Sequence, residues 1–515
     1  MKHTLFTGSV IAGLFIFFTA MQTSAQETSP FGICAHLQGG EEHHQMPENL
    51  RLIREAGIRW LRVDFSWSGI ESPQGTWKYD HIDRVVEEAE KKELQILPLL
   101  LYNVSWANPA YQHLDFWLEY VEKTVSRYKD KCRYWEIWNE PNLFWDNPDG
   151  ANYKTLLEAT YKKIKEIDPG LTVLYGGTSG IPMQFIERSL EAGIGECFDV
   201  VNVHPYRGRM TSVGLSAGYL EDLDRLRALM DKYHIGHKKI WVTEMGWSSW
   251  TPVNASNKAA FHEMKNRLAP DKKWKVGVMF DKKYLVRQTL SEQEIRSLFT
   301  DDYDVRFIRM PDLKTDLTQY DALFFPPWEE YPVEHLWDAL LPAFNYSIKG
   351  GRMYFYGDVA VTEEEQAIGL PQSMLLSFRF GIERYFWYEF QAPEQNPFDR
   401  EDRFGIVHRN LEPKPAYHAY ATLTGVYTEG STVDKSVKWN RKNFCLISWT
   451  QPAGTRVWAI WSPGGARQVT VKIGKGLQQA MDYLGVSLPV TEASKTLTIG
   501  PGITYLVGPQ TLEVK

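Results

Sequence analysis

Cysteine is scarce in this chain, with four residues in 515. They stand far apart and show none of the short spacings that hold a metal ion: Cys34, Cys132, Cys197 and Cys445. Four is an even number, so disulfide pairing in an oxidising compartment and burial as free thiols both remain open. The sequence therefore offers no cysteine-based metal site.

Excess positive charge is also absent. The chain carries 57 basic and 64 acidic residues, a formal net charge of -7. Such a balance provides no polycationic face, which argues against nucleic acid as the main partner.

Long apolar runs are missing except at the N-terminus. There Lys2 precedes "LFTGSVIAGLFIFFTA", and the small residues Thr23 and Ala25 follow at the place where a signal peptidase cleaves. The run is too short and too interrupted for a stable membrane span. We therefore predict a signal peptide over residues 1–25, a secreted or periplasmic protein, and no membrane span.

Length and aromatic content are what the sequence does have. A chain of 515 residues is too long for one ordinary core, so two or three domains are expected. Aromatic residues make up 14% of the chain, with 19 Trp and 26 Tyr. Flat apolar rings with a polar edge suit ligands such as sugars, which are apolar on one face and hydroxylated at the edges.

Short apolar segments alternate with amphipathic ones over most of the chain, which is typical of βα units around a parallel sheet. The expected strands are 31–37, 58–67, 94–102, 134–140, 171–177, 198–206, 239–247 and 382–391. Helical periodicity follows at 79–93, 116–128, 219–233 and 414–423. Eight βα units predict a (β/α)8 TIM barrel, an α/β fold, over residues 26–250 and 358–425.

Residues 251–357 interrupt the barrel before its eighth strand. They alternate on a smaller scale, with strands expected at 274–280, 303–310, 320–327 and 351–357 and helices at 290–299 and 333–344. This pattern predicts an inserted flavodoxin-like α/β domain. It has no Gly-rich phosphate loop, so we expect no nucleotide cofactor. A structural role, or formation of a homo-oligomer, is the first interpretation; a lid over the catalytic face is the alternative.

Helical periodicity stops after about residue 425. Short alternating strands separated by Gly, Pro and Asn turns predict a C-terminal β-sandwich domain over residues 426–515. Trp458 and Trp461 would let such a domain bind carbohydrate. The alternative is an accessory domain that packs on the barrel.

The fourth and seventh expected strands each end on a glutamate. In "YWEIWNEPN", residues 134–142, alternation places Glu136, Trp138 and Glu140 on one face, with Glu140 at the carboxyl end of the strand. In "KIWVTEMGW", Glu244 holds the same position. Barrel active sites lie at this end, and strand ends three apart in a ring of eight face each other. Two facing carboxylates are what glycoside hydrolysis requires, and Glu136 is expected to be an interior carboxylate held by its neighbours.

These residues, in this order, resemble the retaining glycoside hydrolases of clan A. The resemblance is carried by Asn139-Glu140-Pro141, Thr243-Glu244, Arg62 in "RVDFSW", "HPY" at 204–206, "FWYEF" at 386–390 and "FGIVHRNLEPKPAYHAY" at 404–420. The opening "GIRWLRVDFSWSGIESPQGTWKYDHID" is most similar to family 39 and its relatives. The likeness covers about residues 31–250 and 358–425. The insert departs from the ordinary family 39 pattern, so the substrate of that family does not transfer.

The resemblance implies a double displacement on O-glycosidic bonds of oligo- or polysaccharides. Glu140 would be the general acid and then the general base, and Glu244 the nucleophile. This mechanism needs no metal and no cofactor. The alternative from another class is a carbohydrate-binding protein on a barrel that has lost catalysis.

The resemblance also implies supporting roles. Asn139 would bind the sugar 2-hydroxyl, with a loop-facing amide as the alternative. Arg62 and Tyr206 would position Glu244 and keep it ionised. His204 would either touch the site or be a satisfied core histidine.

Aromatic and histidine contacts to the substrate are the least specific expectations. Trp387 on the eighth strand would form a sugar platform, with an outward-facing core ring as the alternative. His36 and Trp106, near the ends of the first and third strands, are weaker candidates for substrate contacts.

Overall fold

The computed structural model of the chain describes residues 29–143, 150–206, 218–249, 261–262, 265–266, 268–280, 291–309, 316–325, 346, 352–355, 361–394, 401–436, 444–463 and 465–515. The predicted signal peptide lies outside these residues and stays a prediction. Among the helices they form, none has the length and apolar character needed to cross a membrane.

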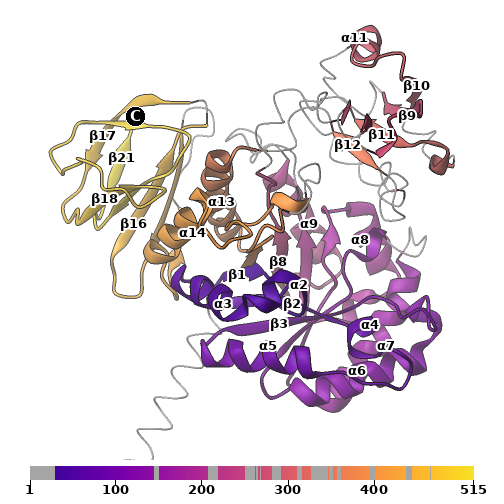
Figure 1. The fold of residues 1–515 in the computed structure, drawn as a ribbon. Coiled ribbons are helices and arrows are strands. Elements are labelled where there is room, and N and C mark those ends of the chain that lie inside the picture. Colours follow the sequence, from indigo (N-terminus) through magenta and orange to yellow (C-terminus); the bar gives the residue numbers. More distant parts are fainter. Residues whose placement is uncertain are drawn as a thin grey trace, which may run out of the picture.

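Within the described residues, eight parallel strands close into a barrel (Figure 1). They are β1 (Phe31–Cys34), β2 (Trp60–Ser66), β3 (Gln95–Leu101), β4 (Tyr134–Ile137), β5 (Thr172–Leu174), β7 (Val200–His204), β8 (Lys239–Met245) and β13 (Arg384–Trp387). Strand β13 lies between β8 and β1, and the pairing of Leu174 with Val200 joins β5 to β7. A short strand, β6 (Thr178–Ser179), also pairs with β7. The predicted TIM barrel is confirmed.

Helices surround the barrel, and most present one apolar stripe to it. In α5, for example, Ile82, Val85, Val86 and Ala89 are the buried residues. The longer helices are α3 (Met46–Glu55), α5 (Asp80–Lys91), α6 (Leu114–Tyr128), α7 (Ala151–Ile167), α8 (Met183–Glu191), α9 (Tyr219–Lys232), α13 (Glu363–Arg379) and α14 (Pro415–Val426). Shorter ones are α2 (Gly40–His44), α4 (Trp67–Ile70), η1 (Ala110–Gln112), η2 (Pro141–Leu143), η3 (Ile194–Glu196) and η7 (Glu401–Arg403).

The amino ends of the barrel strands are filled by aromatic rings around a buried arginine. Arg384 lies 4.4 Å from the ring centroid of Trp60, 4.3 Å from that of Trp241 and 5.2 Å from that of Tyr134. Phe386 stacks on Trp241 with centroids 6.2 Å apart. This packing closes the amino end, so the polar interior groups lie toward the carboxyl ends.

The insert contains its own parallel sheet in the order β10-β9-β11-β12. Its elements are β9 (Trp274–Met279), α11 (Glu292–Arg296), β10 (Tyr303–Ile308), η6 (Leu317–Gln319), β11 (Ala322–Phe325) and β12 (Met353–Phe355). The first strand lies inside the sheet and the second at its edge, as in flavodoxin-like folds, so the predicted architecture is confirmed. The helix expected at 333–344 lies outside the described residues, and the exact domain boundaries stay predictions.

The C-terminal region forms two antiparallel sheets, as predicted for a sandwich. One contains β14 (Thr432–Val433), β15 (Cys445–Thr450), β16 (Arg456–Trp461), β18 (Gln479–Asp482) and β20 (Thr504–Val507); the other contains β17 (Arg467–Ile473), β19 (Thr496–Ile499) and β21 (Leu512–Val514). This domain lies beside α13 and α14 (Figure 1), and Trp449 Nε1 donates to the Val426 carbonyl at 2.9 Å.

Two sequence-based alternatives are decided by burial. Trp458 and Trp461 are 6% and 1% exposed, so neither ring presents a face to a sugar, and carbohydrate binding through them is wrong. The packing on the barrel favours the accessory-domain interpretation. All four cysteines are buried and free, so the disulfide alternative is also wrong.

Candidate active site

The carboxyl ends of β2 and β4 carry a buried ion pair between Arg62 and Glu136. Arg62 donates from Nε to Glu136 Oε2 at 2.7 Å and from Nη2 to Oε1 at 2.9 Å. Asn202 Nδ2 and Thr243 Oγ1 also donate to Oε1, at 2.9 and 3.2 Å. Burial alone would raise the pKa of Glu136, but Arg62 and His204 outweigh burial and lower it to about 2. Glu136 is therefore an ionised anchor beneath the site, in line with the interior role expected for it.

Strict alternation ends just after β4. Trp138 and Glu140 have φ values of 69° and 46°, in the left-handed region. Trp138 consequently packs outward, with its ring centroid 5.9 Å from that of Trp117. The predicted face shared by Glu136, Trp138 and Glu140 is thus wrong for Trp138, whose ring belongs to the outer core.

Glu244 ends β8 among hydrogen-bond donors and is 8% exposed. Arg62 Nη1 donates to its Oε1 at 2.5 Å, and the Tyr206 hydroxyl donates to its Oε2 at 3.0 Å. Burial acts to raise the pKa of Glu244, but the positive charges of His204 and Arg62 outweigh it and lower the value. Glu244 is held as a carboxylate, the form that a nucleophile needs.

His204 ends β7 with both ring nitrogens engaged. Its Nδ1 lies 3.2 Å from Glu140 Oε1 and 3.7 Å from Glu244 Oε2, and its Nε2 lies 2.9 Å from Thr243 Oγ1. Burial would lower the pKa of His204, but Glu244 and the neighbouring carboxylates raise it to about 9. The ring is therefore an imidazolium between the two predicted catalytic glutamates, which combines the two interpretations offered for it.

The two glutamates face each other at short range. One side-chain ligand atom each from Glu140, His204 and Glu244 lies within 4.8 Å of the others. Retaining glycosidases hold their carboxyl groups about 5 to 5.5 Å apart. The same donor atoms could hold a metal ion, which would bind the histidine in its neutral form. The arrangement also fits a carboxylate pair with a histidine between them.

Asn139 and Tyr206 line this pair. Asn139 Oδ1 accepts from Arg62 Nη2 at 2.9 Å, which leaves the amide nitrogen to donate to a ligand. Burial and the charge of Glu244 raise the pKa of Tyr206 well above its usual range, so its hydroxyl stays a donor. Asn139 is therefore not the loop-facing amide of the alternative interpretation.

The predicted platform on β13 requires a correction. Trp387 is fully buried, with its ring centroid 5.3 Å from that of Trp247, so it is the outward-facing core ring of the alternative. Phe386 and Tyr388, two residues apart in the chain, both face the barrel interior. The Tyr388 ring lies edge-on to Tyr206, with centroids 6.4 Å apart. Tyr388 directly follows β13. Among the described residues of this segment, it is the aromatic residue that borders the site.

The two weaker candidates differ in position. His36 lies with its ring 6.0 Å from that of Tyr388 and its Nε2 3.1 Å from Glu389 Oε2. Trp106 packs edge-on against Trp67 and Phe116, with centroids 5.5 and 5.3 Å away. The described contacts therefore bring His36 to the edge of the site and leave Trp106 in a separate aromatic cluster.

Sequence reasoning missed several residues of the site, among them Asp64, Tyr102, Asn202, Thr243, Tyr388 and Glu389. Asp64 lies two residues beyond Arg62, the same face of β2, a signal that alternation could have supplied. Tyr102 follows β3 and is 41% exposed. Burial and the carboxylates of Asp64, Glu244 and Glu140 raise the pKa of Tyr102. Its ring is thus exposed and within the electrostatic reach of the site.

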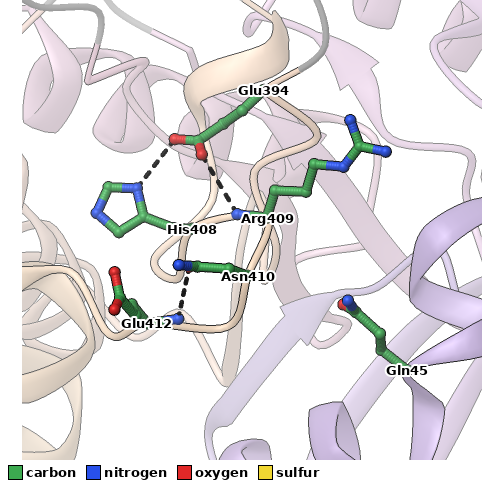
Figure 2. A pocket seen from close by; sticks show the side chains of 6 residues that line it. All are labelled: Gln45, Glu394, His408, Arg409, Asn410 and Glu412. Carbon is green, nitrogen blue, oxygen red and sulfur yellow. Dashed lines mark hydrogen bonds and ion pairs between the residues drawn. The ribbon is translucent and has the colours of Figure 1, made fainter.

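A separate hollow of about 520 Å³ lies beside the loop after β13 (Figure 2). It is lined by Gln45, Glu394, His408, Arg409, Asn410 and Glu412. Glu394 accepts from His408 Nδ1 at 3.0 Å and from the Arg409 amide at 3.3 Å. This carboxylate is therefore held by its own loop, and the hollow contains a second glutamate–histidine pair.

Comparison with known proteins agrees with the geometry. The family model for Cellulase (glycosyl hydrolase family 5) matches residues 21–279, just over half of the chain. A beta-xylosidase of Geobacillus stearothermophilus is 26% identical over 169 residues, 29% of this chain and 33% of that protein. A 6-phospho-beta-glucosidase of Clostridium longisporum is 30% identical over 122 residues, 21% of this chain and 25% of that protein. These alignments span a third or less of the curated relatives' length.

The fold has solved counterparts. A family 39 glycoside hydrolase from the gut symbiont Bacteroides cellulosilyticus WH2 superposes with a TM-score of 0.64 at 19% identity, covering 94% of this chain and 82% of that one. At this identity the likeness concerns the fold. It extends over nearly the whole chain, in agreement with the architecture described above.

Proposed function

Because the chain belongs to the cellulase family of glycosyl hydrolases (family 5), within clan A, we propose that it is a retaining β-glycosidase acting on oligo- or polysaccharides. The observation that carries the proposal is the facing pair Glu140 and Glu244, whose nearest ligand atoms lie within 4.8 Å. That spacing is close to the roughly 5 to 5.5 Å of retaining enzymes and well below the roughly 6.5 to 9.5 Å of inverting enzymes.

In the first step, the Glu244 carboxylate attacks the anomeric carbon while protonated Glu140 gives its proton to the leaving oxygen. The glycosidic bond breaks, and a glycosyl ester forms on Glu244. Arg62 and Tyr206, which donate to Glu244 at 2.5 and 3.0 Å, hold the attacking carboxylate in place. The Asn139 amide donates to the sugar 2-hydroxyl, a contact that strengthens in the transition state.

In the second step, Glu140 accepts a proton from water as the water attacks the same carbon. The ester bond to Glu244 breaks, the free sugar leaves, and the original protonation is restored. Esterification removes the charge of Glu244 next to His204, 3.7 Å away, so the imidazolium then acts mainly on Glu140.

Substitution of each glutamate tests the proposal. We expect Glu244→Ala to lower kcat/KM on nitrophenyl β-glycosides at least about 10⁴-fold, because covalent catalysis is lost. Glu140→Ala should lower kcat about 10²- to 10⁴-fold, because the base for the second step is lost. Azide should restore turnover of Glu244→Ala, because the small anion replaces the carboxylate. The matched control is Glu412→Ala, which removes an exposed carboxylate at the separate hollow beside the loop after β13. This variant should keep full activity.

The stereochemistry provides an independent measurement. Proton NMR of the first product should show the substrate's anomeric configuration. Inversion would contradict the double displacement, and wild-type activity in either glutamate variant would contradict the assignment. Tight oligosaccharide binding by the wild type without turnover would instead favour the carbohydrate-binding alternative.

We further propose that the protein is exported to the periplasm or the medium, on the sequence pattern of residues 1–25. Mass spectrometry of the N-terminus of the exported protein tests this. Homo-oligomer formation through the insert remains a prediction, which sedimentation of the chain with and without residues 251–357 would check.

A further inference from the structure

A second group of charged side chains lies beside the glutamates, at the ends of three adjacent strands. The sheet order β13-β1-β2 makes these strands neighbours. Cys34 pairs with Arg62, so His36 and Asp64 stand two residues further along neighbouring strands. Glu389 follows the end of β13. We call His36, Asp64 and Glu389 the polar wall.

The histidine of the polar wall is fixed from two sides. Its Nε2 lies 3.1 Å from Glu389 Oε2, and its backbone amide donates to Glu42 Oε2 at 2.9 Å. The Glu389 side chain is 2% exposed, whereas that of His36 is 41% exposed. The carboxylate therefore lies behind and the imidazole in front, edge-on to Tyr388 at the border of the site.

Two side chains of the polar wall can form hydrogen bonds with a ligand: His36 can donate one, and Asp64 can accept one. Partial burial acts to lower the pKa of His36, but the hydrogen bond to Glu389 outweighs it and raises the value, which favours a protonated ring whose second N–H can donate. Burial raises the pKa of Asp64, and the nearby charges of His36 and Arg62 oppose this rise, so its carboxyl group lies within their electrostatic reach. In either protonation state this carboxyl group offers an oxygen that accepts a hydrogen bond. A sugar hydroxyl both donates and accepts, so two neighbouring hydroxyls match this pair.

We propose that His36 and Asp64 bind hydroxyl groups of the sugar seated against Glu244, and that Glu389 positions His36 for this contact. This inference rests on the proposed function, because it names residues that contact the sugar at the same site. The polar wall thus lies beside the catalytic pair Glu140 and Glu244. His36 and Asp64 contact the sugar, whereas Glu389 affects sugar binding only by positioning His36.

Monodeoxy substrates test the contacts directly. We expect His36→Asn and Asp64→Asn each to lower kcat/KM on the best nitrophenyl β-glycoside by about 10- to 100-fold, the range for a charged hydrogen bond. On the analogue that lacks the contacted hydroxyl, each variant should lose less than about threefold relative to wild type. If every deoxy analogue loses the same factor as the parent glycoside, the wall does not contact hydroxyls and the proposal is overturned.

The positioning role of Glu389 has its own measurement. Glu389→Gln should raise KM more than it lowers kcat, and should lower the pKa of His36 followed by NMR, because the carboxylate partner is gone. The matched control is Glu394→Gln, which removes the equivalent charge from the second pair, Glu394–His408, at the outer hollow (Figure 2). That control should leave all substrates within about twofold. Equal behaviour of the two variants would contradict the role of Glu389.

Should the wild type hydrolyse no glycoside, the proposed function fails by itself. Calorimetry of parent and deoxy sugars with the wild type and the Asp64→Asn variant then decides the wall separately, because it measures binding.

Discussion

Two arginines lie inside the same barrel, equally buried at 5% exposure, and are stabilised by different chemistry. Arg62, at the carboxyl ends, donates to two carboxylates and an amide. Arg384, at the amino ends, lies over the rings of Trp60, Trp241 and Tyr134. The contacts of Arg62 orient carboxylates that can react. The contacts of Arg384 pack aromatic rings into the amino end of the barrel.

The difference shows how one barrel separates catalysis from stability. The Arg62 guanidinium holds Glu136 and Glu244 ionised and oriented. If Arg62 is removed, these buried carboxylates lose the main cation that balances their charge. A guanidinium among rings is held mainly by their faces. The carboxylate that Arg384 also contacts, Glu383 at 3.4 Å, is partly exposed and lies outside the site. We therefore expect the two ends of the barrel to respond differently to the same substitution.

The largest effect is expected from Arg62→Met. It leaves Glu136 and Glu244 buried without their main cation, so unfolding should become easier by about 3 to 5 kcal/mol. Activity should fall at least about 100-fold, because Glu244 loses a preorganised donor. Urea denaturation and kcat/KM measure the two losses. Activity within tenfold of wild type would show that His204 and Tyr206 suffice to hold the nucleophile.

The next effect is a pH window of stability. The pKa of Glu136, lowered from 4.5 to about 2, gives stability that is complete above pH 4.5 and is lost as pH falls toward 2. The pKa of His204, raised from 6.5 to about 9, gives stability that is complete below pH 6.5 and is lost as pH rises through 9. Each limb amounts to about 3 kcal/mol. Denaturation at a series of pH values should therefore place the maximum between pH 4.5 and 6.5.

Comparison of the variants sharpens this prediction. Arg62→Met should lose much of the acid limb, because Glu136 is then no longer held ionised by its main partner. Arg384→Met should keep both limbs. An acid limb unchanged in Arg62→Met would assign it to other carboxylates.

A smaller effect is expected from Arg384→Met. The cation–π contacts are lost, which costs up to about 2 kcal/mol, and the methionine retains part of the packing. Activity should stay within about twofold of wild type, because the substitution lies at the opposite end of the strands. Thermal denaturation together with kcat/KM checks both statements. A large loss of activity with an intact fold would show that the two ends are coupled.

The smallest effect is expected from a third arginine, Arg51 on α3. It contacts Glu48 Oε1 and Glu55 Oε2, both at 2.5 Å, and so has two carboxylate partners like Arg62. Its side chain is 43% exposed, so water screens these pairs. Arg51→Met should leave the denaturation midpoint and the activity unchanged. A clear shift of the denaturation midpoint would mean that the number of carboxylate partners, rather than burial, determines how much an arginine stabilises the fold.

Much of this fold could be predicted because its elements have strong periodicity. The eight barrel strands were expected within a few residues of their positions, and Glu140 and Glu244 were expected at strand ends that face each other. Such placement needs only alternation and the geometry of a closed barrel. The insert and the sandwich followed from changes of period along the chain.

The errors arise where a local backbone feature or a run of similar residues defeats alternation. Trp138 turns outward because its φ is positive, a feature that its residue type disfavours and the sequence does not announce. Phe386, Trp387 and Tyr388 are consecutive rings, so the pattern cannot decide which of them faces inward. The pairing of His36 with Glu389 joins residues far apart in sequence, and its geometry emerges only when the barrel closes.

The position of β13 between β8 and β1 has a consequence for how the protein is made. During synthesis from the N-terminus, seven barrel strands emerge before β13, and the whole insert is translated while β1 and β8 remain open sheet edges. Such edges invite pairing with other chains. The strand that carries Glu244 thus gains its second neighbour only with β13, as β1 does. Completion of the catalytic pocket is a late event on the ribosome, set by the arrival of residues 384–387.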